Sequence, residues 1–341
     1  MNIKYRPEID GLRAISVISV IIYHFGKIAE FSFMELKGGF LGVDIFFVIS
    51  GYLITLIILK EIYSTKNFSF LNFYIRRVRR ILPALLVMIL LTIPFAWYFL
   101  LPYDLVDFSK SILSIIAFNS NFYFWYTQTQ YAAEAAIYKP LLHTWSLAVE
   151  EQYYILMPFF LLITFKYFRK YLLVLAISFF LISLIISTYG TYNFPNFNFY
   201  NLISRSFEIL AGSILGLIKF KFTFKNTNKK INNIFSFLGI ILIIFSFFYF
   251  DESDLLPSIY SLIPVLGACL VIFFTEEENI IKKILSNKYL VYVGLISYSL
   301  YLWHYPIFSF AKIIDVNTNN LINNLIIIIT FVVLAVCSYH F

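Results

Sequence analysis

Charged residues are scarce in this chain, since Asp, Glu, Lys and Arg make up only 13% of its 341 residues. Soluble domains carry about 25% charged residues, and half that share cannot cover a globule of this size. The scarcity therefore excludes a soluble enzyme. Cysteine is scarcer still, and Cys269 and Cys337 both lie in apolar runs, so we expect neither a disulfide framework nor a zinc site, and no other metal.

Apolar residues, in contrast to charged ones, are abundant. They form 60% of the chain, and 21% of all residues are aromatic. This excludes a disordered protein and predicts an all-α fold, a polytopic transmembrane bundle forming a single domain over 1–341. A spanning helix needs about 20 apolar residues, and ten segments qualify: 11–28, 40–59, 81–101, 143–164, 171–189, 203–218, 233–250, 257–274, 290–311 and 321–341.

The distribution of basic residues tests this count. With a cytoplasmic N-terminus, 19 of the 26 Lys and Arg residues fall in inside segments and 5 in outside segments. Such a bias supports the orientation and an even number of spans, so the net charge of +7 reflects topology and predicts no binding to nucleic acid. The first apolar run lacks a cleavage site and resembles an uncleaved anchor. Residues 109–126 are predicted to be interfacial or re-entrant, although a true span is an alternative.

Ionisable residues inside apolar helices cost free energy and are usually functional. Arg13 and His24 share the first predicted helix and, being eleven positions apart, lie on one face. A neutral imidazole is well suited to take a proton from a hydroxyl near neutral pH. Asp44, at a similar depth in the second helix, could orient an imidazole or pair with a cation. The alternative for each residue is hydrogen-bonded packing inside the bundle.

Four arginines precede the third predicted helix on the inside: Arg76, Arg77, Arg79 and Arg80. Arginine forms bidentate bonds to phosphate, so the cluster suits a cytoplasmic polyphosphate ligand. Anchoring of topology at the lipid headgroups is an equally weighted alternative.

Further polar residues occur in three later segments. His143, Ser146 and Glu150 fall on one face where the fourth helix begins, and Glu151 is the next residue. Arg205 and Glu208 are spaced i, i+3, which favours a structural salt bridge. By depth, one group gathers toward the outer leaflet: His24, Asp44, His143, Glu150 and His304. This predicts acid–base chemistry near the outside and phosphate binding inside.

Six motifs in this order resemble the acyltransferase 3 family of integral membrane proteins. They are RPEIDGLRAI with Tyr23-His24, GVDIFFVISGY at 42–52, FYIRRVRRILP at 73–83, HTWSLAVEEQ at 143–152, Arg205-x-x-Glu208-x-x-x-Gly212, and SYSLYLWH at 297–304. The resemblance implies a cytoplasmic acyl-CoA donor, Arg13 and His24 as an essential pair, and the paired-arginine pattern at Arg76 to Arg80. Many members add an extracellular hydrolase domain of the Ser-Gly-Asn-His type. This sequence ends in its last apolar run, so either it is a fragment or this member lacks that domain, and the sequence does not support a relay through a second active site.

We therefore expect an O-acyltransferase in the plasma membrane. Ile, Asn, Lys and Phe are abundant, as in proteins from AT-rich genomes, which suggests a bacterium and hence its inner membrane. It would transfer an acyl group, most simply acetyl from acetyl-CoA, to a hydroxyl of a surface or lipid-linked glycan, among the membrane lipids. His24 would act as base or as a covalent nucleophile, with Asp44 or Glu150 orienting it. Arg13 and the arginine cluster would bind the donor, and His143, Ser146 and His304 the substrate. The alternative is a transporter or flippase with a proton relay through buried carboxylates, but the sequence lacks mirrored halves.

Overall fold

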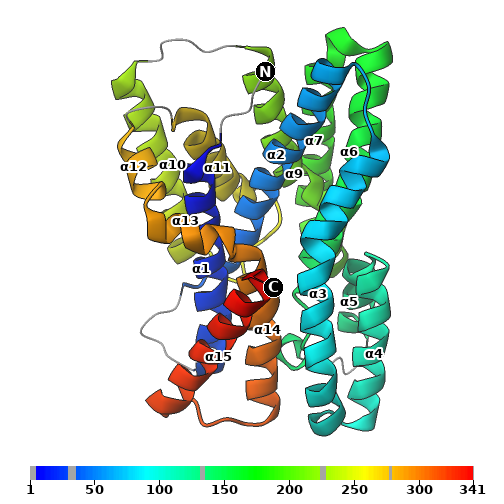
Figure 1. Cartoon of the computed structure of the whole chain (residues 1–341), viewed down its shortest axis with the longest axis vertical. Coiled ribbons are helices and arrows are strands. Elements are labelled where there is room, and N and C mark those ends of the chain that lie inside the picture. Colours follow the sequence, from blue (N-terminus) through cyan, green and yellow to red (C-terminus); the bar gives the residue numbers. More distant parts are fainter. Residues whose placement is uncertain (1–4, 30–35, 131–134, 223–227, 276–278, 341) are drawn as a thin grey trace. The chain divides into compact units, whose positions relative to one another are not determined.

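The computed structural model describes residues 5–29, 36–130, 135–222, 228–275 and 279–340. Lys4, Lys225 and Glu134, which the topology and loop predictions include, lie outside these ranges, as does Phe341. Within them every regular element is helical (Figure 1). The all-α prediction is thus confirmed.

Seven helices of the described chain are long and apolar enough to cross a membrane, which makes this a polytopic membrane protein. They are α1 (Pro7–Ala29), α2 (Gly42–Thr65, extended by η2 at Gly39–Leu41), α3 (Phe70–Phe99), α6 (Thr144–Tyr167), α7 (Leu172–Asn193, preceded by η4 at Arg169–Tyr171), α10 (Lys229–Tyr249) and α15 (Leu321–His340).

The other three predicted spans also coincide with helices, which are shorter or more charged. They correspond to α9 (Leu202–Lys221), α11 (Leu262–Phe274, preceded by η5 at Ile259–Ser261) and the pair α13 (Lys288–Leu295) and α14 (Ser297–Ile313). The predicted segment 290–311 is therefore not one helix, because the helix is interrupted at Ile296. The total of ten spans stays a prediction.

The predicted interfacial segment 109–126 contains two short helices, α4 (Pro102–Ile116) and α5 (Ser120–Gln128). Phe118, between them, has a φ of 53°, a left-handed conformation that interrupts an α-helix. Neither helix reaches the length of about 20 residues that a span requires. The remaining short elements are η3 (Ala136–Tyr138), α8 (Pro195–Tyr200) and α12 (Ile280–Leu285).

The chain folds into two compact units, each made of three separate segments. The first unit comprises residues 1–20, 37–68 and 150–295, and the second comprises 21–36, 69–149 and 296–341. Helix α1 contributes its first part to the first unit and its last part to the second, and α6 begins in the second unit and continues in the first.

Close contact between α2 and α9 organises the first unit. The two helices approach so closely that a Cβ added to Gly51 would overlap the Ile209 backbone oxygen, and one added to Gly212 would overlap the Val48 backbone oxygen. Glycine is therefore required on both helices, in line with the use of small residues where membrane helices cross.

Gly212→Ala is accordingly expected to lower the free energy of unfolding by about 1–3 kcal/mol, because the added methyl must displace backbone rather than a flexible side chain. The control is Gly26→Ala, since a Cβ at Gly26 meets no atom within 4 Å and the change gains helix propensity. Thermal unfolding of both variants in detergent measures the effect. Equal stability of the two variants would contradict the close approach.

In the second unit, α14 packs beside α15 and α3 (Figure 1). The Trp303 indole N–H donates to Ser338 Oγ at 3.0 Å, and the Tyr298 hydroxyl donates to the Ile81 carbonyl at 3.0 Å. These bonds fix the rotation of α14 about its axis, and with it the direction of the side chains on its remaining face.

Candidate active site

Three of the four histidines of the chain meet in the second unit. The His304 ring lies 5.4 Å from the His24 ring and 5.6 Å from the His143 ring, measured between centroids. Tyr305 completes the cluster, at 4.9 Å from His24 and 5.3 Å from His143. The structure thus brings together three residues that the sequence predicted at a similar depth, from α1, the start of α6 and α14.

Tyr301 holds the cluster in place by hydrogen bonds. Its hydroxyl donates to the His143 carbonyl at 2.9 Å and lies 2.6 Å from Ser146 Oγ. Its own carbonyl lies 2.6 Å from His304 Nδ1. A carbonyl can only accept, so Nδ1 carries the hydrogen, and the neutral ring then presents a lone pair on Nε2.

His143 and His304 are buried and have ring nitrogens available for a ligand. His143 is 3% exposed and His304 is 0% exposed. Within the described chain, neither ring nitrogen of His143 makes a hydrogen bond, nor does His304 Nε2. Buried polar atoms are nearly always hydrogen-bonded, and exceptions often mark a catalytic role or an unseen molecule. The cluster is therefore equipped to accept a proton from a bound hydroxyl.

A second polar group, in the first unit, contains Asp44. Arg205 Nη1 donates to Asp44 Oδ1 at 3.1 Å and to Glu208 Oε1 at 2.8 Å, with all three side chains at most 4% exposed. The guanidinium also covers the Phe199 ring. Asn201 caps α9 by accepting from the Ile203 N–H, which places Arg205 on the first turn. The predicted i, i+3 bridge is confirmed, and Asp44 is its additional member.

Removing Arg205 alone is expected to destabilise the first unit, because it leaves two buried carboxylates without a counter-charge. Arg205→Met should cost about 3–5 kcal/mol. The triple variant Asp44→Asn, Arg205→Met, Glu208→Gln should recover part of this loss. Lys170→Met, on an exposed residue, is the control for thermal unfolding. A triple variant less stable than Arg205→Met would rule out a charge imbalance as the cause.

Glu150 also belongs to the first unit. Its Oε1 accepts from the Ser50 hydroxyl and from the Tyr154 hydroxyl. Glu151 is 7% exposed. Glu151 is therefore buried, whereas Glu150 is half-buried and is held by hydroxyl donors from α2 and α6.

The predicted donor-binding arginines occur in both units. In the first, Arg13 Nη1 lies 3.4 Å from Asp10 Oδ1. In the second, the four arginines of α3 follow its Ser69 cap. Arg76, Arg79 and Arg80 are exposed, while Arg77 is half-buried over the Phe73 ring. The three exposed guanidiniums form a basic surface at the start of α3.

An acyltransferase domain model matches residues 6–340. The chain belongs to this acyltransferase family. It is 32% identical to the peptidoglycan O-acetyltransferase OatA of Listeria monocytogenes, over 99% of this chain and 55% of that protein. It is 34% identical to the O-acetyltransferase OatA of Staphylococcus aureus, over 91% of this chain and 51% of that protein. The chain thus spans about half the length of these relatives, and no solved structure matches it.

Sequence reasoning missed two tyrosines of this acyltransferase's histidine cluster. Tyr301 lies three positions before His304 and four before Tyr305, so all three residues can share a helix face. The spacing was visible in the sequence, but tyrosine is common in this chain, with 26 copies. Arg6 was also missed as a site residue. It donates to Glu8, to the Tyr52 hydroxyl and to the Ile272 carbonyl in the first unit.

Proposed function

We propose that this acyltransferase transfers an acetyl group from acetyl-CoA to a hydroxyl of a cell-envelope glycan. The observation that carries the proposal is the histidine cluster, in which His24 lies beside the buried His304 and ring nitrogens of His143 and His304 have no hydrogen-bond partner in the described chain. The relatives named as O-acetyltransferases, one of them for peptidoglycan, support this acceptor. Cell-envelope chemistry also suits a chain of the bacterial inner membrane with a cytoplasmic N-terminus, the orientation that the basic residues favour.

In the proposed reaction, His24 removes the proton from the acceptor hydroxyl. The oxygen then attacks the thioester carbonyl, the carbon–sulfur bond breaks, and the CoA thiolate leaves and takes up a proton. His143 and His304 bind the acceptor through their ring nitrogens, with Ser146 nearby. A covalent acetyl-His24, attacked by the acceptor in a second step, is the alternative route.

The carboxylates have supporting roles in this proposal. Asp44 or Glu150 would orient His24 or stabilise its imidazolium. The ion pair of Asp44 with Arg205 favours a structural contribution for Asp44, whereas Glu150 accepts from two hydroxyls and forms no ion pair within the described residues. Glu150 is therefore the better candidate of the two.

The donor would bind through the arginines. Arg76, Arg77, Arg79 and Arg80 carry enough charge to hold the CoA phosphates, since guanidinium–phosphate bonds are strong and bidentate. The exposure of three of them supports access for a soluble ligand. Arg13, half-buried beside Asp10, would contact the donor deeper in the protein.

The test is the consumption of radiolabelled acetyl-CoA by the purified protein in proteoliposomes with soluble peptidoglycan fragments. The expected result is radioactive label that stays on the glycan after the unreacted acetyl-CoA has been removed. Movement of a glycan or lipid across the bilayer without consumption of acetyl-CoA would instead identify the transporter or flippase. Labelled protein at His24 without acceptor would favour the covalent route.

A further inference from the structure

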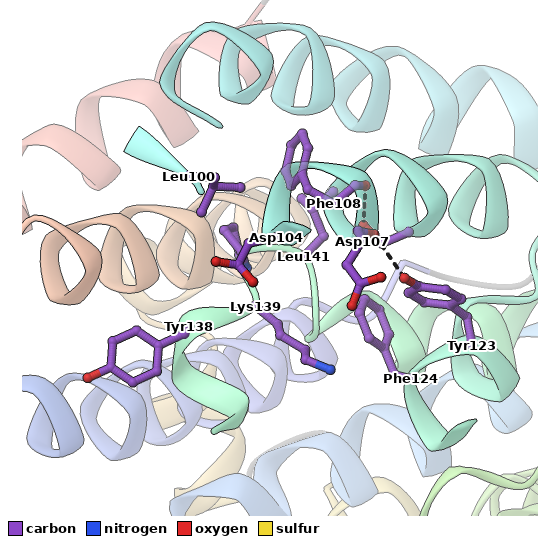
Figure 2. Close-up of a pocket in the computed structure, with 11 residues that line it drawn as sticks. Leu100, Asp104, Asp107, Phe108, Tyr123, Phe124, Tyr138, Lys139 and Leu141 are labelled. Atoms are coloured by element: carbon purple, nitrogen blue, oxygen red, sulfur yellow. Dashed lines mark hydrogen bonds between the residues drawn. The ribbon is translucent and has the colours of Figure 1, made fainter. Parts of the chain in front are cut away.

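A small pocket, partly open to solvent, lies in the second unit away from the arginines of α3. It is bounded by α4, α5 and the segment that follows η3 (Figure 2). Its enclosed part is small, so a ligand would lie across its open side.

The pocket lining carries both signs of charge. Asp104 and Asp107, one turn apart on α4, line one side, and Lys139 lines the other (Figure 2). Asp104 makes no hydrogen bond or ion pair within the described chain. Asp107 lies 3.9 Å from Lys110, a pair that is exposed and therefore weak. Lys139 Nζ donates to the Thr127 carbonyl at 3.3 Å, which anchors its side chain across the pocket.

Aromatic side chains supply the rest of the lining, among them Tyr123, Phe124 and Tyr138. The Tyr123 hydroxyl donates to the Asp107 carbonyl at 2.9 Å and so fixes the end of α5 against α4. Burial raises the pKa of Tyr123, so this phenol stays a donor at neutral pH. Aromatic faces together with a few fixed polar groups are the usual composition of a ligand site.

The chemistry of the lining selects among ligands. With Lys110 beside Asp107, the charges around the pocket nearly cancel, so the lining offers no excess of positive charge to the phosphates of a CoA donor. The ammonium in turn disfavours a simple cation. A neutral polyhydroxylated ligand suits the carboxylates and the ammonium alike, because its hydroxyls donate to Asp104 and Asp107 and accept from Lys139.

The same segment that lines the pocket leads to the histidine cluster. Tyr138 to Leu141 line the pocket, and His143 follows two residues later. The Tyr305 hydroxyl donates to the Ala136 carbonyl of η3 at 2.9 Å, tying this segment to the helix that bears His304. A short stretch of chain thus joins the lining of the pocket to the proposed catalytic residues.

We propose that this pocket binds a sugar unit of the acceptor glycan, with Asp104, Asp107 and Lys139 as its hydrogen-bonding groups. The inference rests on the proposed acetyl transfer for its choice of glycan. It adds an acceptor site distinct from the histidines and from the arginines of α3.

The test uses the full chain in nanodiscs and soluble peptidoglycan fragments as the probe. The variants are Asp104→Asn, Asp104→Asn with Asp107→Asn, and Lys139→Met. The matched control is Asp315→Asn, an exposed aspartate of the same unit. The double variant should raise the Kd for the fragments about tenfold or more, because it removes two charged hydrogen-bond acceptors. Acetyl-CoA affinity and the unfolding temperature should match those of the control.

Each outcome decides between the two proposals. Fragment binding that is lost in the double variant, in a protein that transfers no acetyl group, would keep the sugar site and reject the acetyl transfer. Acetyl transfer with unchanged fragment affinity in all three variants would reject the sugar site alone. A loss of acetyl-CoA affinity with fragment binding intact would also overturn the sugar site, since the pocket would then serve the donor.

Discussion

Loss of acetyl transfer, with normal insertion and folding, is the expected result of His24→Ala. A general base contributes about 10²–10⁴-fold to a rate, so turnover should fall at least a hundredfold. His24→Gln should be as inactive, because an amide cannot accept the proton. Turnover of radiolabelled acetyl-CoA by the purified variants, at saturating donor and acceptor, measures the effect.

The chain supplies its own control for this experiment. His340, the fourth histidine, lies exposed at the end of α15, and His340→Ala should keep full activity. His304→Gln and His143→Gln separate the roles within the cluster. If His304→Gln were inactive while His24→Gln kept turnover, the base would be His304, whose Nε2 lone pair is defined by the bond from Nδ1 to the Tyr301 carbonyl.

A large rise in the KM for acetyl-CoA is expected when the arginines of α3 are replaced by glutamine in pairs. Charge-assisted bonds to phosphate contribute about 1.5–3 kcal/mol each, so Arg79→Gln with Arg80→Gln should raise KM about a hundredfold or more, with less effect on kcat. Steady-state kinetics in detergent provide the measurement.

The matched control removes the same charge elsewhere. Lys229 and Lys230 are exposed at the start of α10, and Lys229→Gln with Lys230→Gln should leave the KM unchanged. Cysteine-accessibility mapping, after replacement of Cys269 and Cys337, reports the topology of each variant. An inverted or poorly expressed arginine variant whose correctly inserted fraction keeps its donor affinity would assign the cluster to topology alone.

Sequence reasoning located the helices well because a long apolar run in a membrane can satisfy its backbone hydrogen-bonding groups by forming a helix. It could not locate the interruption at Ile296, since residues 290–296 carry no charged side chain and a change in backbone dihedral angles leaves hydropathy unaltered. The same limit applied at Phe118, whose left-handed conformation divides α4 from α5.

In the candidate site, too, contacts encoded by local spacing could be predicted and contacts between distant residues could not. The bridge from Arg205 to Glu208 followed from a local spacing, and it is present. The bridge from Arg205 to Asp44 joins residues 161 positions apart, and no local pattern encodes it. The histidines were grouped by their estimated depth, whereas Tyr301 and Tyr305 were lost among the many tyrosines of an aromatic chain.

The length of α3 gives the proposed reaction a direction. The helix is continuous from Phe70 to Phe99, with the arginines near its start and Leu100 of the sugar pocket just beyond its end. About twenty residues at about 1.5 Å each separate Arg80 from Leu100, which equals the hydrocarbon thickness of a bilayer, about 30 Å. In the proposed reaction α3 would thus cross the membrane with the donor and the acceptor bound on opposite sides, and acetylation would be vectorial. Sealed vesicles of one orientation should consume donor from one face only and carry the modified glycan on the other.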